Sequence, residues 1–313
     1  MDMALYSIVI PLYNEEEVIG ECIRRVVSVC DGIDGDCEII FVNDGSADRT
    51  RELAINACNN DKRIKLINFS RNFGHQIAIT AGMDNASGDA VIVMDADLQD
   101  PPEVINELIN KYNEGYDVVY AVRAQRKGET VFKKLTAKAF YRFLRYMCNI
   151  DIPVDTGDFR LISRKVCDVM KTLTERNRYV RGLVSWVGFK QAAVEYVREE
   201  RFAGETKYPL KKMIKLSLDG ITSFSSKPLT MSKNLGFLAA AAGFIYMIVV
   251  IFQKFVFGKT VQGWASLAVL ILLMGGIQLI MLGIAGEYIA RIFDESKNRP
   301  LYIIDEKYNF NGD

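Results

Sequence analysis

VIVMDADLQDPP, residues 91–102, ends an apolar run in two aspartates one residue apart, and a helical pattern begins directly after its prolines. A short apolar run of this kind is typical of a buried strand in a parallel sheet. Where the strand ends, the carboxylates of Asp95 and Asp97 lie near each other, and a divalent cation relieves their repulsion. Mg²⁺ or Mn²⁺ held there also binds phosphate oxygens, so the stretch predicts a nucleotide diphosphate site. An isolated Asp-x-Asp pair is common in surface loops, and its place after an apolar strand is what favours the metal site.

Short β-branched runs alternate with helical patterns on both sides of this strand, through about Ser163. The alternation is typical of a parallel sheet covered by helices, which predicts an α/β fold of the doubly wound kind. The expected strands are Ser7–Pro11, Glu38–Asn43, Ile64–Asn68, Ala90–Asp95, Val118–Ala121 and, further along, Gln191–Val197. The expected helices are Glu16–Val29, Asp48–Asn59, His75–Asn85, Pro102–Glu114 and a basic, aromatic-rich Glu129–Asn149.

Polar residues follow the strands, where ligands bind in sheets of this class. They lie in residues 11–15, 43–46, 70–74 and 95–97, and we expect them to converge on one nucleotide site. Each segment also has a purely structural interpretation as a turn, with Ser46 and Asn72 as helix caps. No Gly-rich dinucleotide fingerprint and no GxxxxGK[ST] loop occurs, so a metal ion and basic side chains are expected to hold the phosphates.

Composition excludes several classes of protein. Lys+Arg and Asp+Glu are both 39, so no basic excess indicates nucleic acid as a partner. The six cysteines form no CxxC pair and are expected to be reduced thiols of a cytoplasmic domain, and no signal peptide is recognised. His75 is the only histidine, which argues against a histidine-based triad, and we expect it to be a polar residue at a helix start.

Two apolar stretches, Leu235–Phe257 and Trp264–Ala285, are each long enough to cross a membrane. Flanking lysines and arginines predict cytoplasmic termini by the positive-inside rule. Leu210–Phe224 has an apolar stripe flanked by lysines, which fits a helix in the membrane interface or one packed on the head. The expected division is a cytoplasmic catalytic domain at 1–208, an amphipathic interface segment at 209–233, two transmembrane helices at 234–287 and a cytoplasmic tail at 288–313.

Taken together, these motifs resemble family 2 glycosyltransferases of the GT-A fold. The resemblance rests on Pro11, Tyr13, Glu15, the Asn43–Ser46 turn, the 95–102 segment, Thr156–Arg160 and Arg201–Tyr208. It extends through the hairpin to the branch of dolichol-phosphate mannose synthases and bacterial bactoprenol (undecaprenyl-phosphate) glucosyltransferases. It implies a Rossmann-like, mixed but mostly parallel sheet and a homo-oligomer such as a tetramer.

The resemblance also implies residue roles. Pro11, Tyr13, Glu15, Asp44 and Asp95 would hold the nucleoside. The metal ligands would be Asp97 and Gln99, and the catalytic residues Asp158 and Arg201. Lys207 would meet a phosphate group, with Arg123 and Lys138 as weaker phosphate candidates. A plain turn cap is the structural alternative for Asp158, and a solvated basic face is the alternative for the lysines and arginines after Glu129.

The implied reaction is inverting transfer of one hexose, most simply glucose, from a UDP-sugar to undecaprenyl phosphate at the cytoplasmic face of a bacterial inner membrane. Such a product would supply cell-envelope glycans. No arginine precedes Trp186 or Trp264, so the QxxRW motif of processive synthases is absent and single transfer is favoured. A phosphate acceptor is already ionised, so Asp158 is expected to orient Arg201 or the acceptor. The alternatives are GlcNAc, mannose or an aminopentose as the sugar, another lipid as acceptor, and a non-catalytic nucleotide-binding protein.

Overall fold

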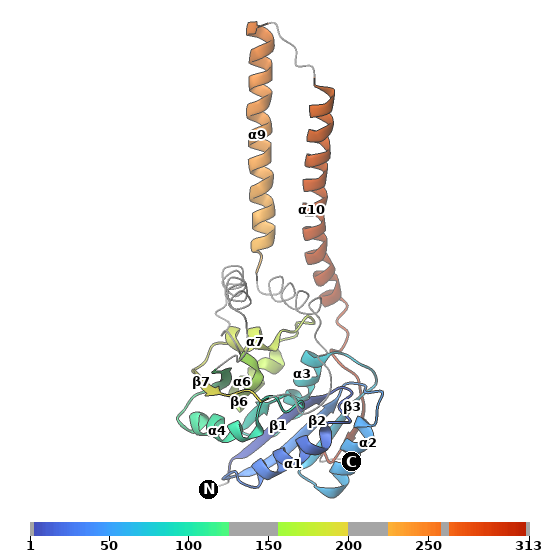
Figure 1. The fold of residues 1–313 in the computed structure, drawn as a ribbon, viewed down its shortest axis with the longest axis vertical. Helices are drawn as coiled ribbons and strands as arrows, with labels where there is room; N and C mark the ends of the chain where they lie inside the picture. Colours follow the sequence, from blue (N-terminus) through green and yellow to red (C-terminus); the bar gives the residue numbers. More distant parts are fainter. Residues whose placement is uncertain (1–2, 125–155, 200–224, 258–262, 311–313) are drawn as a thin grey trace.

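The computed structural model describes residues 3–124, 156–199, 225–257 and 263–310 (Figure 1). A head with an eight-stranded sheet carries a hairpin of two long helices, and the strand order is β7-β5-β6-β4-β1-β2-β3-β8. Three predicted site residues, Lys138, Arg201 and Lys207, lie outside the described residues, as do the expected helices at Glu129–Asn149 and Leu210–Phe224.

The parallel part of the sheet holds the strand that ends at the acidic pair. β1 (Leu5–Leu12) pairs in parallel with β4 (Ala90–Val93) on one side and with β2 (Asp36–Asn43) on the other. β2 pairs in parallel with β3 (Ile64–Phe69). β1, β2 and β4 are almost wholly buried, because helices cover both faces of the sheet.

The other part of the sheet makes it mixed. β6 (Thr156–Ser163) runs antiparallel between β4 and β5 (Val118–Arg123). β7 (Gln191–Tyr196) then pairs in parallel with β5. The predicted mixed, mostly parallel α/β sheet is therefore confirmed.

Two hydrophobic clusters show which helices cover each face of the sheet. One contains Ile8 and Ile10 of β1 and packs against α1 (Ile19–Cys30), α2 (Thr50–Asn60) and, after the 3-10 turn Pro102–Val104, α4 (Ile105–Asn113). The other contains Val9 and packs against α3 (His75–Asn85), α6 (Arg164–Thr172) and α7 (Val180–Trp186). Alternate residues of one strand thus enter opposite cores, as the pleat requires.

The two predicted helix caps are wrong. The N-caps of α2 and α3 are Arg49 and Gly74, and neither makes a side-chain cap. The hydroxyl of Ser46 instead accepts a hydrogen bond from the backbone N–H of Asn14 at 3.0 Å. The side chain of Asn72 donates to the carbonyl of Asp44 at 3.1 Å. Both residues therefore connect loops at the end of the sheet and do not cap the starts of α2 and α3.

The expectation of reduced thiols is wrong for one pair of cysteines. Cys30 at the end of α1 and Cys37 in β2 form a disulfide, with their Cα atoms 5.8 Å apart. The turn between the helix and the strand brings them together, which spacing alone did not indicate. Cys22, Cys58 and Cys167 are free and buried.

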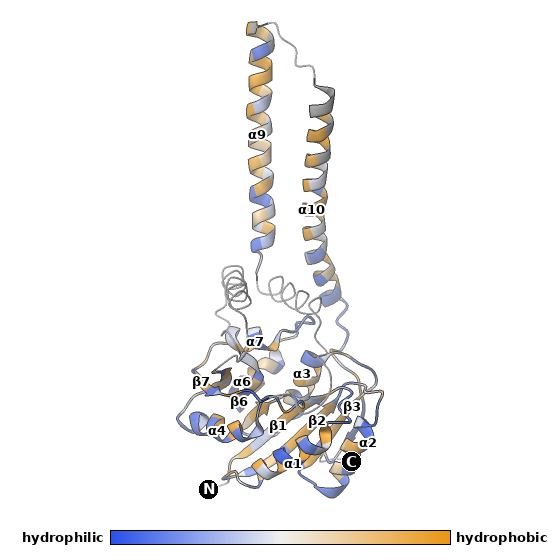
Figure 2. Cartoon of the chain, in the orientation of Figure 1, coloured by the Kyte–Doolittle hydropathy of each residue, from blue (hydrophilic) through white to orange (hydrophobic). Residues whose placement is uncertain are grey.

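The hairpin consists of α9 (Lys227–Phe257) and α10 (Trp264–Ser296), which lie side by side above the head in Figure 1. Apolar residues predominate along both helices in Figure 2, and both are long and apolar enough to cross a membrane. Beyond α10 the chain returns to the head, where β8 (Ile304–Tyr308) pairs antiparallel with β3. No sequence pattern predicted this strand, because it has only five residues and much of its surface is exposed.

Candidate functional site

The loops after β1 and β2 are joined by hydrogen bonds at the carboxyl edge of the sheet. Asn14 has a positive φ of 53°, and its side chain accepts a hydrogen bond from the N–H of Ala47 at 2.8 Å. The N–H of Glu15 donates to the hydroxyl of Thr50 at 2.8 Å. This fixes the loop that carries Tyr13, whose ring is 43% exposed and so accessible to a planar base.

Asp44 lies buried at the end of β2 and holds the loop before α3. Its carboxylate accepts hydrogen bonds from the backbone N–H groups of Phe73 at 2.6 Å and Gly74 at 3.0 Å. Burial raises the pKa of this carboxyl despite those two bonds. The loop packs so closely that a Cβ on Gly45, at φ 66°, would lie 2.6 Å from the backbone nitrogen of Asn72. Asp44 therefore shapes the wall of the site.

Asp158, on β6, is the most heavily engaged carboxylate of the site. Arg181 of α7 donates from Nε to Oδ1 at 2.7 Å and from Nη2 to Oδ2 at 3.1 Å. His75 Nε2 and Gln76 Nε2, at the start of α3, lie 3.1 and 3.2 Å from Oδ2. Two helices and a strand thus meet at a carboxylate that is only 4% exposed.

Charge is balanced within this group, in which Asp158 is buried and the other residues are half-buried. Burial opposes ionisation of Asp158, but Arg181 and His75 outweigh it and hold the pKa of Asp158 well below its usual range. Burial also lowers the pKa of His75, but Asp158 and Asp95 together raise it to about 9. Burial raises the pKa of Asp95 to about 6 against the charge of His75, whose Nε2 is 3.4 Å away. With a pKa of about 6, Asp95 is mostly ionised at neutral pH, so the carboxylates of Asp95 and Asp158 balance the charges of His75 and Arg181.

The acidic loop after β4 fits a divalent cation. Asp95 Oδ1 is buried and accepts no hydrogen bond within the described part of the chain, so it has capacity for a cation. Asp97 accepts a hydrogen bond from the N–H of Gln99 at 3.1 Å across Leu98, a non-glycine residue at φ 57°. Backbone strain of this kind occurs where the surroundings fix a functional loop. The donors are carboxylate and amide oxygens, which Mg²⁺ and Mn²⁺ prefer.

A second set of possible ligands overlaps the first. Ligand atoms of His75, Asp95 and Asp158 all lie within 4.8 Å of one another. In this structure, however, Nε2 of His75 bridges the two carboxylates and so supplies the positive charge between them. The loop with Asp97 and Gln99 is therefore the better fit, with Asp95 shared by both sets.

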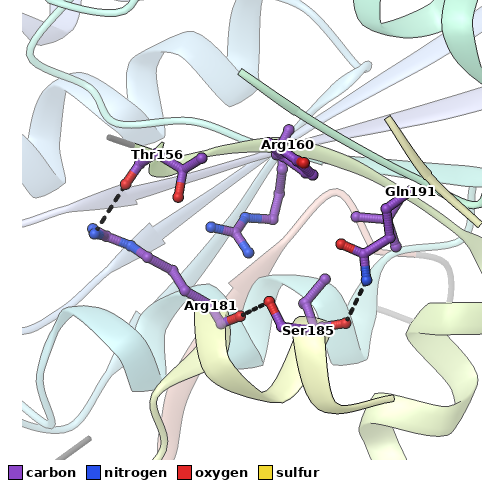
Figure 3. A pocket seen from close by; sticks show the side chains of 8 residues that line it. Thr156, Arg160, Arg181, Ser185 and Gln191 are labelled. Atoms are coloured by element: carbon purple, nitrogen blue, oxygen red, sulfur yellow. Dashed lines mark hydrogen bonds between the residues drawn. The ribbon is translucent and has the colours of Figure 1, made fainter. Parts of the chain in front are cut away.

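A small pocket lined by both polar and apolar residues lies beside Arg181, the partner of Asp158 (Figure 3). Arg181 donates from Nη1 to the carbonyl of Thr156 at 3.2 Å, and the hydroxyl of Ser185 donates to the carbonyl of Arg181 at 3.1 Å. Arg160 is buried and donates to the carbonyls of Asp158 and Gly157, and burial lowers its pKa to about 10. This second layer holds β6 and α7 together and so fixes Arg181 against Asp158.

Sequence reasoning missed His75 and Arg181. His75 directly follows the polar loop 70–74, and the expected position of that loop at the sheet edge could have indicated that His75 belongs to the site. Arg181 carried no such signal, because only the packing of α7 on α6 and α3 brings it to β6. Pro11 lies near the end of β1, and the predicted residues that follow strands ending at the same edge are Tyr13, Glu15, Asp44, Asp95, Asp97 and Gln99.

Comparisons with known proteins identify the family. Residues 7–170 match the family described as Glycosyl transferase family 2. The chain is 61% identical over 303 residues to "Uncharacterized glycosyltransferase YkcC" of Bacillus subtilis (strain 168), covering 97% of this chain and 94% of that protein. It is 44% identical over 298 residues to "Prophage bactoprenol glucosyl transferase homolog" of Escherichia coli (strain K12), covering 95% and 97%.

Among solved structures, glucosyl-3-phosphoglycerate synthase from Mycobacterium tuberculosis, in complex with phosphoglyceric acid, is 23% identical with a TM-score of 0.47. That match covers 70% of this chain and 78% of the other. The resemblance inferred from the sequence motifs is confirmed by the family match and by the relatives over nearly their full length. This chain is a glycosyltransferase and belongs to glycosyl transferase family 2.

Proposed function

We propose that the protein transfers one glucose from UDP-glucose to undecaprenyl phosphate, with inversion at the anomeric carbon. The observation that carries this proposal is the 44% identity to a bactoprenol glucosyl transferase homolog, which spans the head and the hairpin alike. The acidic edge of the sheet and the two apolar helices supply the two parts that such a reaction needs: a donor site and a membrane anchor.

In this proposal the donor lies at the carboxyl edge of the sheet. Pro11, Tyr13, Glu15, Asp44 and Asp95 contact the nucleoside. Asp97 and Gln99 hold Mg²⁺ or Mn²⁺. The buried Oδ1 of Asp95 accepts no hydrogen bond from the described residues and has His75 Nε2 as an ion-pair partner at 3.4 Å, and it supports a cation beside them. When bound, the metal ion neutralises negative charge that develops on the departing diphosphate.

The acceptor needs no general base. A phosphate monoester has its second pKa near 6 and arrives mostly ionised at neutral pH. One of its oxygens forms a bond to the anomeric carbon while the bond from that carbon to the β-phosphate oxygen breaks, and the electron pair leaves with UDP. No proton is transferred in this step. We therefore assign no proton acceptor. The contacts to phosphate oxygens are assigned to the basic residues Arg123, Lys138, Arg201 and Lys207.

Asp158 acts in this scheme by position and charge. Both of its oxygens already accept hydrogen bonds, from Arg181, His75 and Gln76, and its low pKa makes it a weak proton acceptor. Arg201 was the expected partner, but the described partner is Arg181. The Asp158 carboxylate keeps both Arg181 and His75 at the edge where the sugar would lie.

The hairpin anchors the head to the membrane. The chain is divided into a catalytic domain at 1–208, an interface segment at 209–233, two transmembrane helices at 234–287 and a tail at 288–313. Support comes from β8, which follows α10 yet pairs with β3, so the segments before and after the hairpin are on the same side. The basic residues beside the spans favour the cytoplasmic face of a bacterial inner membrane. A homo-oligomer such as a tetramer remains part of the proposal.

The test uses the full chain, purified in detergent, with UDP-glucose, Mn²⁺ and undecaprenyl phosphate. We expect UDP release that depends on the lipid, and a lipid product heavier by one hexose in mass spectrometry. UDP-GlcNAc and GDP-mannose test the sugar, and diacylglycerol tests the lipid. Nucleotide binding without lipid-dependent turnover would instead support the non-catalytic alternative and overturn the proposal.

A further inference from the structure

A buried carboxylate lies just beyond the metal-binding loop and gathers cations from other elements. Asp100 is 1% exposed and directly precedes Pro101. The hydroxyl of Tyr196, at the end of β7, donates a hydrogen bond to Asp100 Oδ1. Arg123 Nη2, from the end of β5, lies 3.9 Å from the same oxygen, and Arg198 Nε lies 3.7 Å from it. One carboxylate oxygen thus meets a phenol and two guanidinium groups.

Arg198 also connects this cluster to the metal-binding loop. Its Nη2 donates to the side-chain carbonyl of Gln99 at 2.6 Å, and the backbone N–H of Glu199 donates to the carbonyl of Gln99 at 3.0 Å. The side-chain oxygen of an amide has two lone pairs, so an oxygen that accepts from Arg198 can also serve as a metal ligand. The segment after β7 therefore fixes the side chain of a predicted metal ligand.

Arg123 is held from two sides. Its Nε donates to the hydroxyl of Tyr196 at 3.3 Å. On the other side, Gly157 of β6 leaves room for it, since a Cβ there would lie 3.2 Å from Arg123 Nη2 and 3.4 Å from Asp100 Oδ2. Gly157 directly precedes Asp158, so this cluster adjoins the Asp158 carboxylate along the chain.

Charge and exposure indicate what the two arginines bind. Arg123 and Arg198 are 22% and 35% exposed, whereas the carboxylate between them is buried. Two guanidinium groups and one carboxylate leave an excess of one positive charge beside the metal-binding loop. Their distances of 3.7 and 3.9 Å to Asp100 are too long for hydrogen bonds, so the carboxylate attracts both groups without using their donors. Planar guanidinium groups held this way suit phosphate oxygens.

We infer that Asp100, together with Tyr196, is a positioning residue that holds Arg123 and Arg198 as a paired phosphate-binding group and, through Arg198, orients the side chain of Gln99 toward the metal. The inference rests on the proposed function. The phosphate belongs either to the diphosphate of the donor or to the acceptor monoester, since the same chemistry recognises both.

The test compares Asp100→Asn, Tyr196→Phe and Arg198→Gln with the wild-type protein. Glu38→Gln is the matched control, because Glu38 is also a buried carboxylate with a cationic partner, Lys65, but lies toward the other end of its strand. The measurements are KM for UDP-glucose, KM for undecaprenyl phosphate, the Mn²⁺ concentration for half-maximal activity, and UDP affinity by calorimetry with Mn²⁺ or with EDTA.

Asp100→Asn should raise one of the two KM values by about tenfold to a hundredfold, the usual effect of losing charge-assisted contacts. An increase in KM for UDP-glucose assigns the arginines to the donor, and an increase for the lipid assigns them to the acceptor. Asp100→Asn and Arg198→Gln should both weaken UDP binding in Mn²⁺ by more than in EDTA. Their double variant should resemble Asp100→Asn alone, because the two residues act as a unit. Glu38→Gln should change none of these values.

Folded variants that keep both KM values, the Mn²⁺ requirement and the UDP affinity within twofold of wild type would overturn the inference. If Asp100→Asn does not fold, Tyr196→Phe provides the test, with a smaller expected effect of about threefold to tenfold. Failure of the proposed function is distinct from this result: wild-type protein would then show no lipid-dependent turnover. The calorimetric comparison of UDP binding would still test the orientation of Gln99.

Discussion

Arg181 holds Asp158 by a two-point contact, with Nε 2.7 Å from Oδ1 and Nη2 3.1 Å from Oδ2. Lysine cannot form this forked contact. Arg181→Lys should therefore lower kcat by about tenfold to a hundredfold while leaving the KM for UDP-glucose nearly unchanged. Steady-state kinetics at saturating lipid measures both values.

The matched control for this variant is Arg63→Lys. Arg63 makes the same kind of two-point contact with Asp61, from Nε to Oδ1 at 3.2 Å and from Nη2 to Oδ2 at 2.8 Å, but just before β3 and away from the site. Arg63→Lys should retain full activity. Equal losses of kcat in both variants would show that Arg181 only stabilises the fold.

The pH dependence of activity distinguishes a positioning carboxylate from a base. The pKa of Asp158 is held well below its usual range, so Asp158 stays ionised throughout the neutral range and does not titrate there. The activity that remains in Asp158→Asn should keep the acidic limb of the wild-type profile, whereas the alkaline limb should move to lower pH, because Asp158 helps to raise the pKa of His75. If Asp158 were the base, the variant would lose the acidic limb of the wild-type profile.

Much of the fold follows from local sequence. The start and end of α3 were predicted to the residue at His75 and Asn85, and β2 and β3 within two residues, because turn residues bound α3 and both strands are short runs rich in apolar residues. β6 and β8 needed tertiary information, since antiparallel insertion beside β4 and edge pairing with β3 depend on residues far away in the sequence. The Cys30–Cys37 disulfide likewise depends on how α1 turns into β2.

Residues of the candidate site were predictable from the sequence only where they lie next to the end of a strand or belong to a motif. Asp95, Asp97 and Asp158 stood out by position or motif, whereas Arg181 is brought to Asp158 by packing between α7 and β6. His75 was noted mainly because it is the only histidine, and its charge state depends on two carboxylates that spacing alone does not bring near it. Residues that act through neighbours leave little trace in one sequence.

Metal removal tests the acidic loop. EDTA should abolish lipid-dependent UDP release, and added Mn²⁺ or Mg²⁺ should restore it, because carboxylate and amide oxygens are the expected ligands. Asp97→Asn should lower activity by at least a hundredfold at fixed Mn²⁺. Asp34→Asn, in the exposed turn before β2, is the control and should behave as wild type. Undiminished glucosyl transfer by Asp97→Asn would exclude Asp97 as a metal ligand.

The last prediction concerns Tyr302, in the segment that leads from the hairpin into β8. Tyr302 stacks on Phe69 of β3 with ring centroids 5.3 Å apart and donates to Asp84 at 3.1 Å, so it ties the C-terminal segment to β3 and to the end of α3. Tyr302→Ala should reduce the free energy of unfolding by about 2 kcal/mol, through lost stacking and an unpaired Asp84. Tyr302→Phe should lose only the hydrogen bond, about 1 kcal/mol.

Thermal unfolding in detergent measures the stability of both variants. Because α3 begins at His75, Tyr302→Ala should also lower kcat more than Tyr302→Phe does. Unchanged stability in both variants would show that the contacts of Tyr302 with Phe69 and Asp84 are not needed to hold the head together.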